Sequence, residues 1–154
     1  YYKEETFVEI ERKYLIESCP LPLEDFPYHE MEQGYLNTSP VVRIRRSDED
    51  YTLTYKSKGL MVREEYNLPL TKEAYEHLLT KIDGRLIQKR RYLIPLEGGL
   101  TIELDCFKGD LAPLMLAEVE FPSVEMADSF TPPSWFSEDV TFSVLYHNST
   151  LSKL

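Results

Sequence analysis

The sequence predicts a mainly β protein of the α+β class, built from about eight antiparallel strands with a few helices outside. One observation is a succession of short segments rich in β-branched and aromatic residues. Another is that short polar connections separate several of them. The third is an alternation of charged and apolar side chains along nearly every segment, which is the periodicity of a strand.

The strand pattern recurs along the chain between residues typical of turns. The connections at 47–50, 97–99 and 108–110 are short and polar, as hairpins require, so neighbouring strands are expected to run antiparallel. The predicted strands cover residues 6–16, 31–36, 41–46, 51–57, 60–68, 86–94, 100–107 and 114–121.

An amphipathic helix is predicted between the fifth and sixth strands. Thr71 can cap it, an apolar stripe that includes Leu78 runs to about Ile82, and Gly84 lies just past its end. We expect this helix on the outside of the sheet. Shorter helical stretches are expected over 123–130 and 148–154.

Charged side chains share one face of each predicted strand. In the first strand Glu9, Glu11 and Lys13 alternate with Val8 and Ile10, so the two kinds point to opposite faces. The other charged residues in these rows are Arg43, Arg45, Lys56, Arg63, Glu65, Lys89, Arg91, Glu103, Asp105, Glu118 and Glu120.

Two arrangements accommodate such a face. It can be the wet side of an open antiparallel sheet. Alternatively, the strands can close into a barrel and turn the charges inward, where a small interior is filled by side chains. Buried ions cost several kcal/mol each unless opposite charges pair or a ligand completes the network. A bound polyanion with a divalent metal ion would complete it.

Composition excludes several classes of partner. The chain has 154 residues, with 17 basic and 27 acidic side chains and a formal net charge of −10, so neither nucleic acid nor an anionic membrane is an expected partner. No apolar run approaches the roughly 20 residues that span a bilayer. No secretion leader opens the sequence, and Cys19 and Cys106 make a poor disulfide framework, so we expect a cytoplasmic protein.

Short motifs follow one another in order along the chain. They read E-I-E-R-K at 9–13, Q-G-Y-L at 33–36, R-I-R at 43–45, T-L-T-Y-K at 52–56, R-E-E-Y at 63–66, K-R-R-Y at 89–92, E-L-D-C-F at 103–107, A-E-V-E at 117–120, V-T at 140–141 and Y-H-N at 146–148. In combination they resemble the CYTH, or triphosphate tunnel metalloenzyme, superfamily. Asn67 departs from the pattern, since many members place a glutamate there, and the segment 19–29 does not align.

The resemblance implies a single domain over residues 1–154, folded as an eight-stranded antiparallel closed barrel that forms a tunnel. Such a tunnel binds a triphosphate and usually hydrolyses it with Mg²⁺ or Mn²⁺. The sequence is compatible with a homodimer. It contains no glycine-rich phosphate loop, and the scattered His29, His77 and His147 favour neither a zinc site nor a Ser-His-Asp triad.

Cations must surround a triphosphate, because catalysis of phosphoryl transfer is mostly positioning and neutralisation of charge. Each of the expected cations could instead form a structural salt bridge. The expected substrate-binding residues are Lys13, Arg43, Arg45, Lys56, Arg63, Lys89 and Arg91. Within the resemblance, the expected catalytic residues are Glu9, Glu11, Lys13 and Lys56.

Carboxylates at alternate positions on facing strands suit Mg²⁺, which prefers oxygen ligands and shares phosphate oxygens. Glu9 with Glu11 and Glu118 with Glu120 form two such pairs. Additional metal ligands, water-positioning groups or partners for the cations are expected among Glu65, Glu103 and Asp105. In a metal-free alternative, all the carboxylates simply neutralise the basic rows.

The leading functional hypothesis is hydrolysis of inorganic triphosphate (tripolyphosphate) to diphosphate and phosphate. Relatives that share these motifs include class IV adenylyl cyclases and thiamine triphosphatases, so a cyclase or a hydrolase of an organic or nucleoside triphosphate is the alternative among enzymes. A noncatalytic polyphosphate-binding module could use the same cations. An inert sheet protein with a charged surface would bind none of these ligands.

Overall fold

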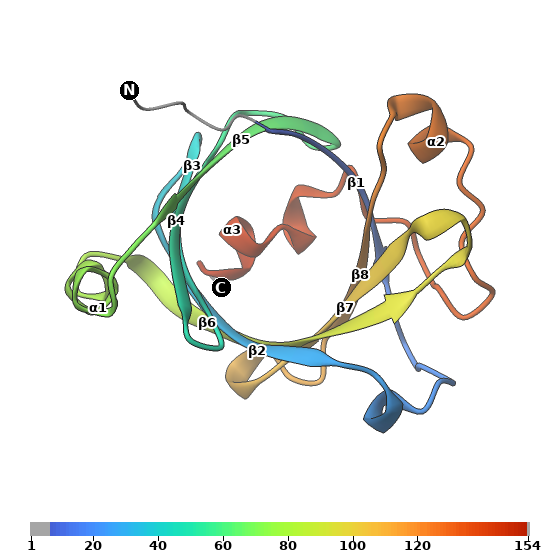
Figure 1. Cartoon of the computed structure of the whole chain (residues 1–154), viewed down its shortest axis with the longest axis horizontal. Helices are drawn as coiled ribbons and strands as arrows, with labels where there is room; N and C mark the ends of the chain where they lie inside the picture. The colour runs from blue at the N-terminus through green and yellow to red at the C-terminus, as the bar shows by residue number, and fades with distance from the viewer. Residues whose placement is uncertain (1–6, 154) are drawn as a thin grey trace.

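The computed structural model describes residues 7–153, which form a closed antiparallel barrel with helices around it (Figure 1). The predicted fold class is confirmed. Residue 6 of the first predicted strand and residue 154 of the last predicted helix lie outside the described residues. The eight strands are β1 (Phe7–Leu15), β2 (Tyr28–Thr38), β3 (Val41–Ser47), β4 (Asp50–Lys56), β5 (Val62–Pro69), β6 (Asp83–Pro95), β7 (Thr101–Phe107) and β8 (Met115–Glu120).

Strand β1 closes the barrel by dividing its pairing between two neighbours. Its first half pairs with β5, up to Ile10 opposite Val62, and its second half pairs with β8, beginning with Glu11 opposite Glu120. Around the ring the order is β1-β5-β4-β3-β2-β6-β7-β8. Because side chains alternate along each strand, closure turns one face of every strand toward the interior.

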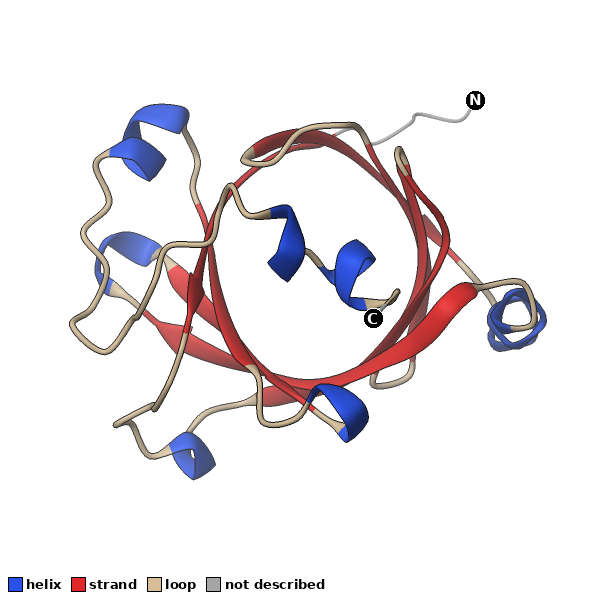
Figure 2. Cartoon of the chain, turned by 180° about the vertical axis from the view of Figure 1, so that it is seen from behind, coloured by secondary structure: helices blue, strands red, loops and turns tan. Residues whose placement is uncertain are grey.

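Two helices pack outside the barrel, α1 (Lys72–Leu79) and α2 (Val124–Asp128) (Figure 2). The Thr71 hydroxyl caps α1 by accepting a hydrogen bond from the Ala74 amide at 3.0 Å. The helix ends at Leu79, short of the predicted 82, because Asp83 already begins β6 and pairs with Tyr35. No helix within residues 7–153 is long and apolar enough to cross a membrane.

The C-terminal segment differs from this external arrangement. Its 3₁₀ helix η4 (Val144–Tyr146) and helix α3 (Asn148–Leu151) lie within the outline of the ring in Figures 1 and 2. Leu151 is buried in a cluster with Tyr35 and Val41, so the segment covers one end of the barrel. The remaining 3₁₀ helices are η1 (Leu23–Asp25), η2 (Glu97–Gly99) and η3 (Gly109–Leu111).

The main apolar core lies against the outer wall of the barrel. Leu104, Ala117 and Val119 are fully buried and pack in one cluster with Phe136, which follows α2. Burying an aliphatic side chain of this size stabilises a protein by roughly 1.5–3 kcal/mol. The packing of external segments on the wall therefore stabilises a barrel whose interior is charged.

Candidate active site

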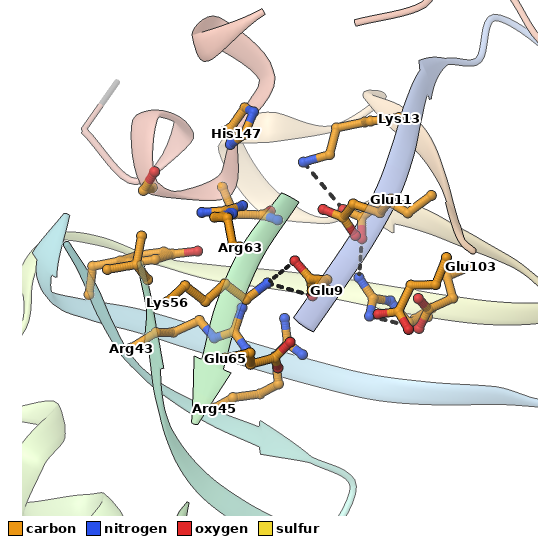
Figure 3. Close-up of a pocket in the computed structure, with 17 residues that line it drawn as sticks. Glu9, Glu11, Lys13, Arg43, Arg45, Lys56, Arg63, Glu65, Glu103 and His147 are labelled. Carbon is orange, nitrogen blue, oxygen red and sulfur yellow. Dashed lines mark hydrogen bonds and ion pairs between the residues drawn. The ribbon is translucent and has the colours of Figure 1, made fainter. Parts of the chain in front are cut away.

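A cavity of about 160 Å³ occupies the interior of the barrel (Figure 3). Every strand contributes at least one side chain to its wall, and the C-terminal segment supplies the rest. The lining residues are Glu9, Glu11, Lys13, Tyr35, Val41, Arg43, Arg45, Lys56, Arg63, Glu65, Arg91, Glu103, Glu118, Glu120, His147, Asn148 and Ser149.

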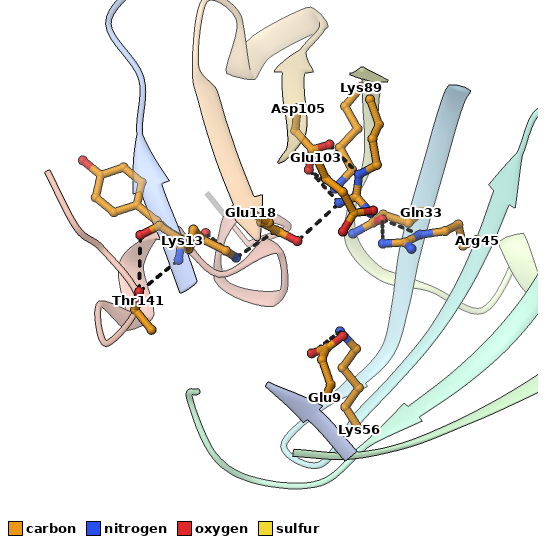
Figure 4. A network of polar contacts seen from close by, with 12 residues as sticks. Glu9, Lys13, Gln33, Arg45, Lys56, Lys89, Glu103, Asp105, Glu118 and Thr141 are labelled. Atoms are coloured by element: carbon orange, nitrogen blue, oxygen red, sulfur yellow. Dashed lines mark hydrogen bonds and ion pairs between the residues drawn. The ribbon is translucent and has the colours of Figure 1, made fainter. Parts of the chain in front are cut away.

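Four cations of the interior are paired with carboxylates (Figure 4). Lys13 Nζ lies 3.3 Å from Glu118 Oε1, and Lys56 Nζ donates to both oxygens of Glu9 at 3.0 Å. The Arg91 guanidinium binds the most carboxylates. It donates to Asp105 Oδ1 at 2.7 Å and Oδ2 at 2.9 Å, to Glu103 Oε2 at 3.0 Å and to Glu118 Oε2 at 3.4 Å.

Lys89 and Asp105 lie behind this wall and do not line the cavity. Both side chains are 0% exposed, and Lys89 Nζ donates to Asp105 Oδ2 at 2.7 Å. Burial alone would raise the pKa of Asp105, but Arg91 and Lys89 outweigh it and hold the pKa below its ordinary value. The structure therefore uses this pair to orient Arg91. Lys89, which was predicted to bind substrate, does not line the cavity, whereas pairing with a cation was one of the three roles expected for Asp105.

Three arginines of the interior make no ion pair with any carboxylate in residues 7–153. Arg45 donates instead to the neutral amide oxygen Oε1 of Gln33, at 2.9 and 2.7 Å. Arg43 is 5% exposed, and its buried Nε has no hydrogen-bond partner among these residues. Arg63 lies near them on the wall of the same cavity. These guanidinium groups are available to an anion that enters the tunnel.

Three carboxylates gather on β1 and β8. Oxygen atoms of Glu9, Glu11 and Glu120 lie within 4.8 Å of one another. Burial, together with Glu118 and Glu9, raises the pKa of Glu11 to about 8. Burial and Glu103 likewise raise the pKa of Glu120 to about 7. Like charges directly opposite each other across a strand pair destabilise it, so this cluster favours a bound cation.

The cluster fits a hard divalent ion, since all three residues offer carboxylate oxygens, the ligands that Mg²⁺ and Mn²⁺ prefer. Glu118, predicted in the same role, is in a different environment. Burial acts to raise its pKa, but Lys13 and Arg91 hold it well below the ordinary value. Glu65 accepts a hydrogen bond from Asn67 Nδ2 at 3.1 Å. Asn67, the residue that departs from the family pattern, therefore holds a neighbouring carboxylate in place.

Several lining residues were missed by the sequence analysis. Tyr35 is buried, and its hydroxyl accepts a hydrogen bond from Gln33 Nε2 at 3.1 Å. Both residues share the inward parity and lie in the Q-G-Y-L motif, but a search limited to charged side chains passed over them. His147 and Ser149 reach the cavity only because the C-terminal segment folds back over the barrel, which no strand periodicity indicates.

Comparison with known proteins finds relatives that are similar in sequence and in structure. The chain is 41% identical to the inorganic triphosphatase of Nitrosomonas europaea over 149 residues, covering 94% of this chain and 96% of the relative. It is 36% identical to the inorganic triphosphatase of Acetivibrio thermocellus over 126 residues, covering 79% and 78%. The crystal structure of the inorganic triphosphatase NE1496 is similar with a TM-score of 0.70 at 38% identity, covering 94% of this chain and 93% of that one.

The family comparison agrees with the barrel and its interior. A model of the CYTH domain matches residues 8–144, a range that takes in nearly all of the eight strands. That range also contains every charged residue of the tunnel wall described above. The chain therefore belongs to the CYTH domain family.

Proposed function

We propose that this protein is a metal-dependent inorganic triphosphatase, which hydrolyses tripolyphosphate to diphosphate and phosphate. The observation that carries the proposal is that one cavity holds three arginines together with two carboxyl groups, Glu11 and Glu120, and that none of these five makes an ion pair among the described residues. The similarity to two proteins named inorganic triphosphatase supports it. A protein in which all charges merely neutralised one another would not leave both kinds unpaired.

Arg43, Arg45 and Arg63 are the groups we assign to the phosphate chain. Their guanidinium groups can bind phosphate oxygens through two parallel hydrogen bonds, and they need not break an internal ion pair to do so. Lys13 and Lys56 border the same space and add positive charge while holding Glu118 and Glu9 in place. Positioning and charge neutralisation of this kind supply most of the catalysis in phosphoryl transfer.

Glu9, Glu11 and Glu120 are the residues we assign to a divalent ion, Mg²⁺ or Mn²⁺. When bound, such an ion supplies charge neutralisation at the phosphate and lowers the pKa of an attacking water. The carboxyl groups of Glu11 and Glu120 must lose their protons to act as ligands. Their raised pKa values therefore make metal affinity increase with pH through the neutral range.

In the reaction, water attacks the terminal phosphorus and the bridging P–O bond breaks, which releases phosphate and leaves diphosphate. Arg43 and Arg63 are positioned to neutralise charge on the transferring group and on the leaving diphosphate. We place this activity in the cytoplasm, in a single domain, with no nucleic acid or membrane as partner. The net charge of −10 supports that view.

The test is a panel of substrates with matched metal conditions. Phosphate release is measured from tripolyphosphate, ATP and thiamine triphosphate with Mg²⁺, Mn²⁺ or EDTA, together with cyclic AMP formation from ATP. We expect tripolyphosphate to be hydrolysed with kcat/KM at least about tenfold above the other two, and activity to be lost in EDTA. Preferred cyclisation or hydrolysis of ATP would contradict the proposal, and tight binding of tripolyphosphate without turnover would indicate a noncatalytic module.

A further inference from the structure

His147 lies at the boundary between the tunnel and a second cavity. The residue lines the interior cavity and also a neighbouring one of about 390 Å³ that borders the C-terminal segment. The residue is 7% exposed and lies at the junction of η4 and α3. Figure 3 shows the imidazole near Lys13 and Arg63, on the C-terminal segment.

The backbone that carries this ring is fixed. The His147 carbonyl accepts hydrogen bonds from the amides of Thr150 and Leu151, both at 2.9 Å. The backbone of Thr141 lies beside the imidazole and acts to raise its pKa. Thr141 is itself held, because its hydroxyl accepts from the Lys13 amide at 2.9 Å. His147 and its neighbour Thr141 are thus held by α3 and β1.

One ring nitrogen lacks a partner among the described residues. Within residues 7–153, nothing hydrogen-bonds to the buried Nε2 of His147. Buried polar atoms are nearly always hydrogen-bonded, and an exception calls for an explanation. In the neutral tautomer that carries its proton on Nδ1, Nε2 has a bare lone pair.

The positive charges near the His147 ring would be neutralised when an anion enters. Burial, then Lys13 on β1 and Arg63 on β5, lower the pKa of His147 to about 4, while Glu118 on β8 acts weakly in the opposite direction. The imidazole is therefore neutral at pH 7 in the free protein. A phosphate chain between these cations would neutralise them and favour a proton on the ring.

We propose that His147 is a substrate-binding residue, whose Nε2 shares one proton with an oxygen of the phosphate nearest the C-terminal segment. The inference rests on the proposed function, because it takes tripolyphosphate as the ligand. The shared proton arrives with the protonated phosphate or from solvent, and it remains between nitrogen and oxygen while the substrate is bound. His147 thereby holds one end of the phosphate chain and takes no part in the attack of water.

Variants at this position give the kinetic test. His147→Phe keeps the bulk of the ring and removes both nitrogens, so we expect KM for tripolyphosphate to rise about tenfold while kcat changes by less than about threefold. His147→Gln, whose amide can still donate to a phosphate oxygen, should recover part of the affinity. His77→Gln removes an exposed histidine on α1 and serves as the matched control with unchanged kinetics.

Nuclear magnetic resonance of the imidazole nitrogens gives a readout independent of turnover. With tripolyphosphate added in EDTA, we expect the Nε2 signal of His147 to shift toward the protonated form, while the signals of His29 and His77 stay in place. An Nε2 signal that does not move overturns the proposal, as does a His147→Phe enzyme with wild-type KM. A shift of Nε2 without any phosphate release by wild-type protein would instead contradict the proposed hydrolase function. If His147→Phe does not fold, the KM of His147→Gln and the Nε2 signal of the wild-type protein still test the proposal.

Discussion

Arg43 and Lys56 are cations on the same tunnel wall, but they differ in their partners. Lys56 binds Glu9, whereas Arg43 has no carboxylate partner among the described residues. A buried charge without a counterion destabilises a folded protein, so its removal relieves a cost. Removing one partner of a buried ion pair instead costs about 3–5 kcal/mol. The substrate would supply the missing negative charge at Arg43, so the two positions should respond oppositely to mutation.

We expect Arg43→Gln to raise KM for tripolyphosphate about tenfold or more and to leave the melting temperature of the ligand-free protein unchanged or higher. Lys56→Gln should lower the melting temperature, because it leaves Glu9 without its cation. Steady-state kinetics and thermal melts of both variants make the comparison. Lys72→Gln, which removes an exposed cation on α1, is the control. An Arg43→Gln protein that melts at a lower temperature than Lys56→Gln would contradict this assignment.

Glu11 tests the metal assignment at a single residue. Glu11→Gln removes one charged oxygen ligand from the cluster with Glu9 and Glu120, so we expect Mg²⁺-dependent phosphate release to fall about 100-fold or more. The fold should persist, because Glu11 makes no ion pair within residues 7–153 that the change would break. Circular dichroism and phosphate release are measured side by side, with Glu73→Gln on α1 as control. Retained turnover would remove Glu11 from the proposed metal site.

The inward face of each strand could be predicted from the sequence, but the pairing of its charges could not. Alternation alone places Glu9 and Lys56 on one face of their strands. Their contact joins residues 47 positions apart and depends on the registers of β1 with β5 and β5 with β4. The same alternation could not show that Lys89 is fully buried behind Arg91. Alternation indicates which face of the sheet a side chain points to, but not how deeply that side chain is buried.

The strands themselves were predicted well in number and order, and least well at the ends of β2 and β6. Tyr28 and Glu30 extend β2 beyond the predicted 31–36, although neither residue lies in an apolar alternation. They pair with Tyr92 and Arg90 of β6, and Arg90 both stacks on the Tyr28 ring and binds Glu30. Tertiary contacts between two distant segments thus set a boundary that local pattern cannot indicate.

The contact between β2 and the chain after α1 depends on Gly34. A Cβ atom at Gly34 would lie 2.7 Å from Cγ2 and 2.9 Å from Cδ1 of Ile82. We therefore expect Gly34→Ala to destabilise the protein by roughly 1–3 kcal/mol, since close packing leaves no room for the methyl group. Urea unfolding measures the change. In the double variant Gly34→Ala/Ile82→Ala the added cost of the alanine at 34 should nearly vanish, and a cost that stays the same would mean that Ile82 is not the obstacle.

At the scale of the whole molecule, the barrel encloses charged side chains and packs an apolar core against part of its outer wall. The choice between an open sheet with a wet face and a closed barrel could not be made from alternation, because both give the same pattern. Closure depends on β1, which pairs with β5 through its first half and with β8 through its second half. That division brings Glu11 directly opposite Glu120 and so creates the carboxylate cluster.

Enclosing these carboxylates makes the stability of the metal-free protein depend on pH. The pKa of Glu11 is about 8 in the folded protein and near 4.5 ordinarily, so the folded state binds its proton more tightly than the unfolded state does. The stability that this gives is complete below pH 4.5 and is lost as pH rises through about 8. Glu118 and Asp105, whose pKa values are lowered, act oppositely, but their contribution is lost only as pH falls toward the acid range.

Between pH 6 and 8.5 Glu120, whose pKa is raised to about 7, and Lys89, whose pKa burial lowers to about 7, titrate with opposite effects on stability, and they do so in the wild type and in Glu11→Gln alike. The difference between the two proteins therefore isolates Glu11, and in EDTA we expect the melting temperature of the wild type to fall by about 5–10 °C relative to that of Glu11→Gln across this interval. Adding Mg²⁺ at pH 8.5 should restore the wild type and not the variant, because an ion that binds only the folded state stabilises it by mass action. A difference between the two proteins that does not change with pH in EDTA would mean that enclosure with Glu9 and Glu120 does not keep Glu11 protonated, and the metal assignment would lose its physical basis.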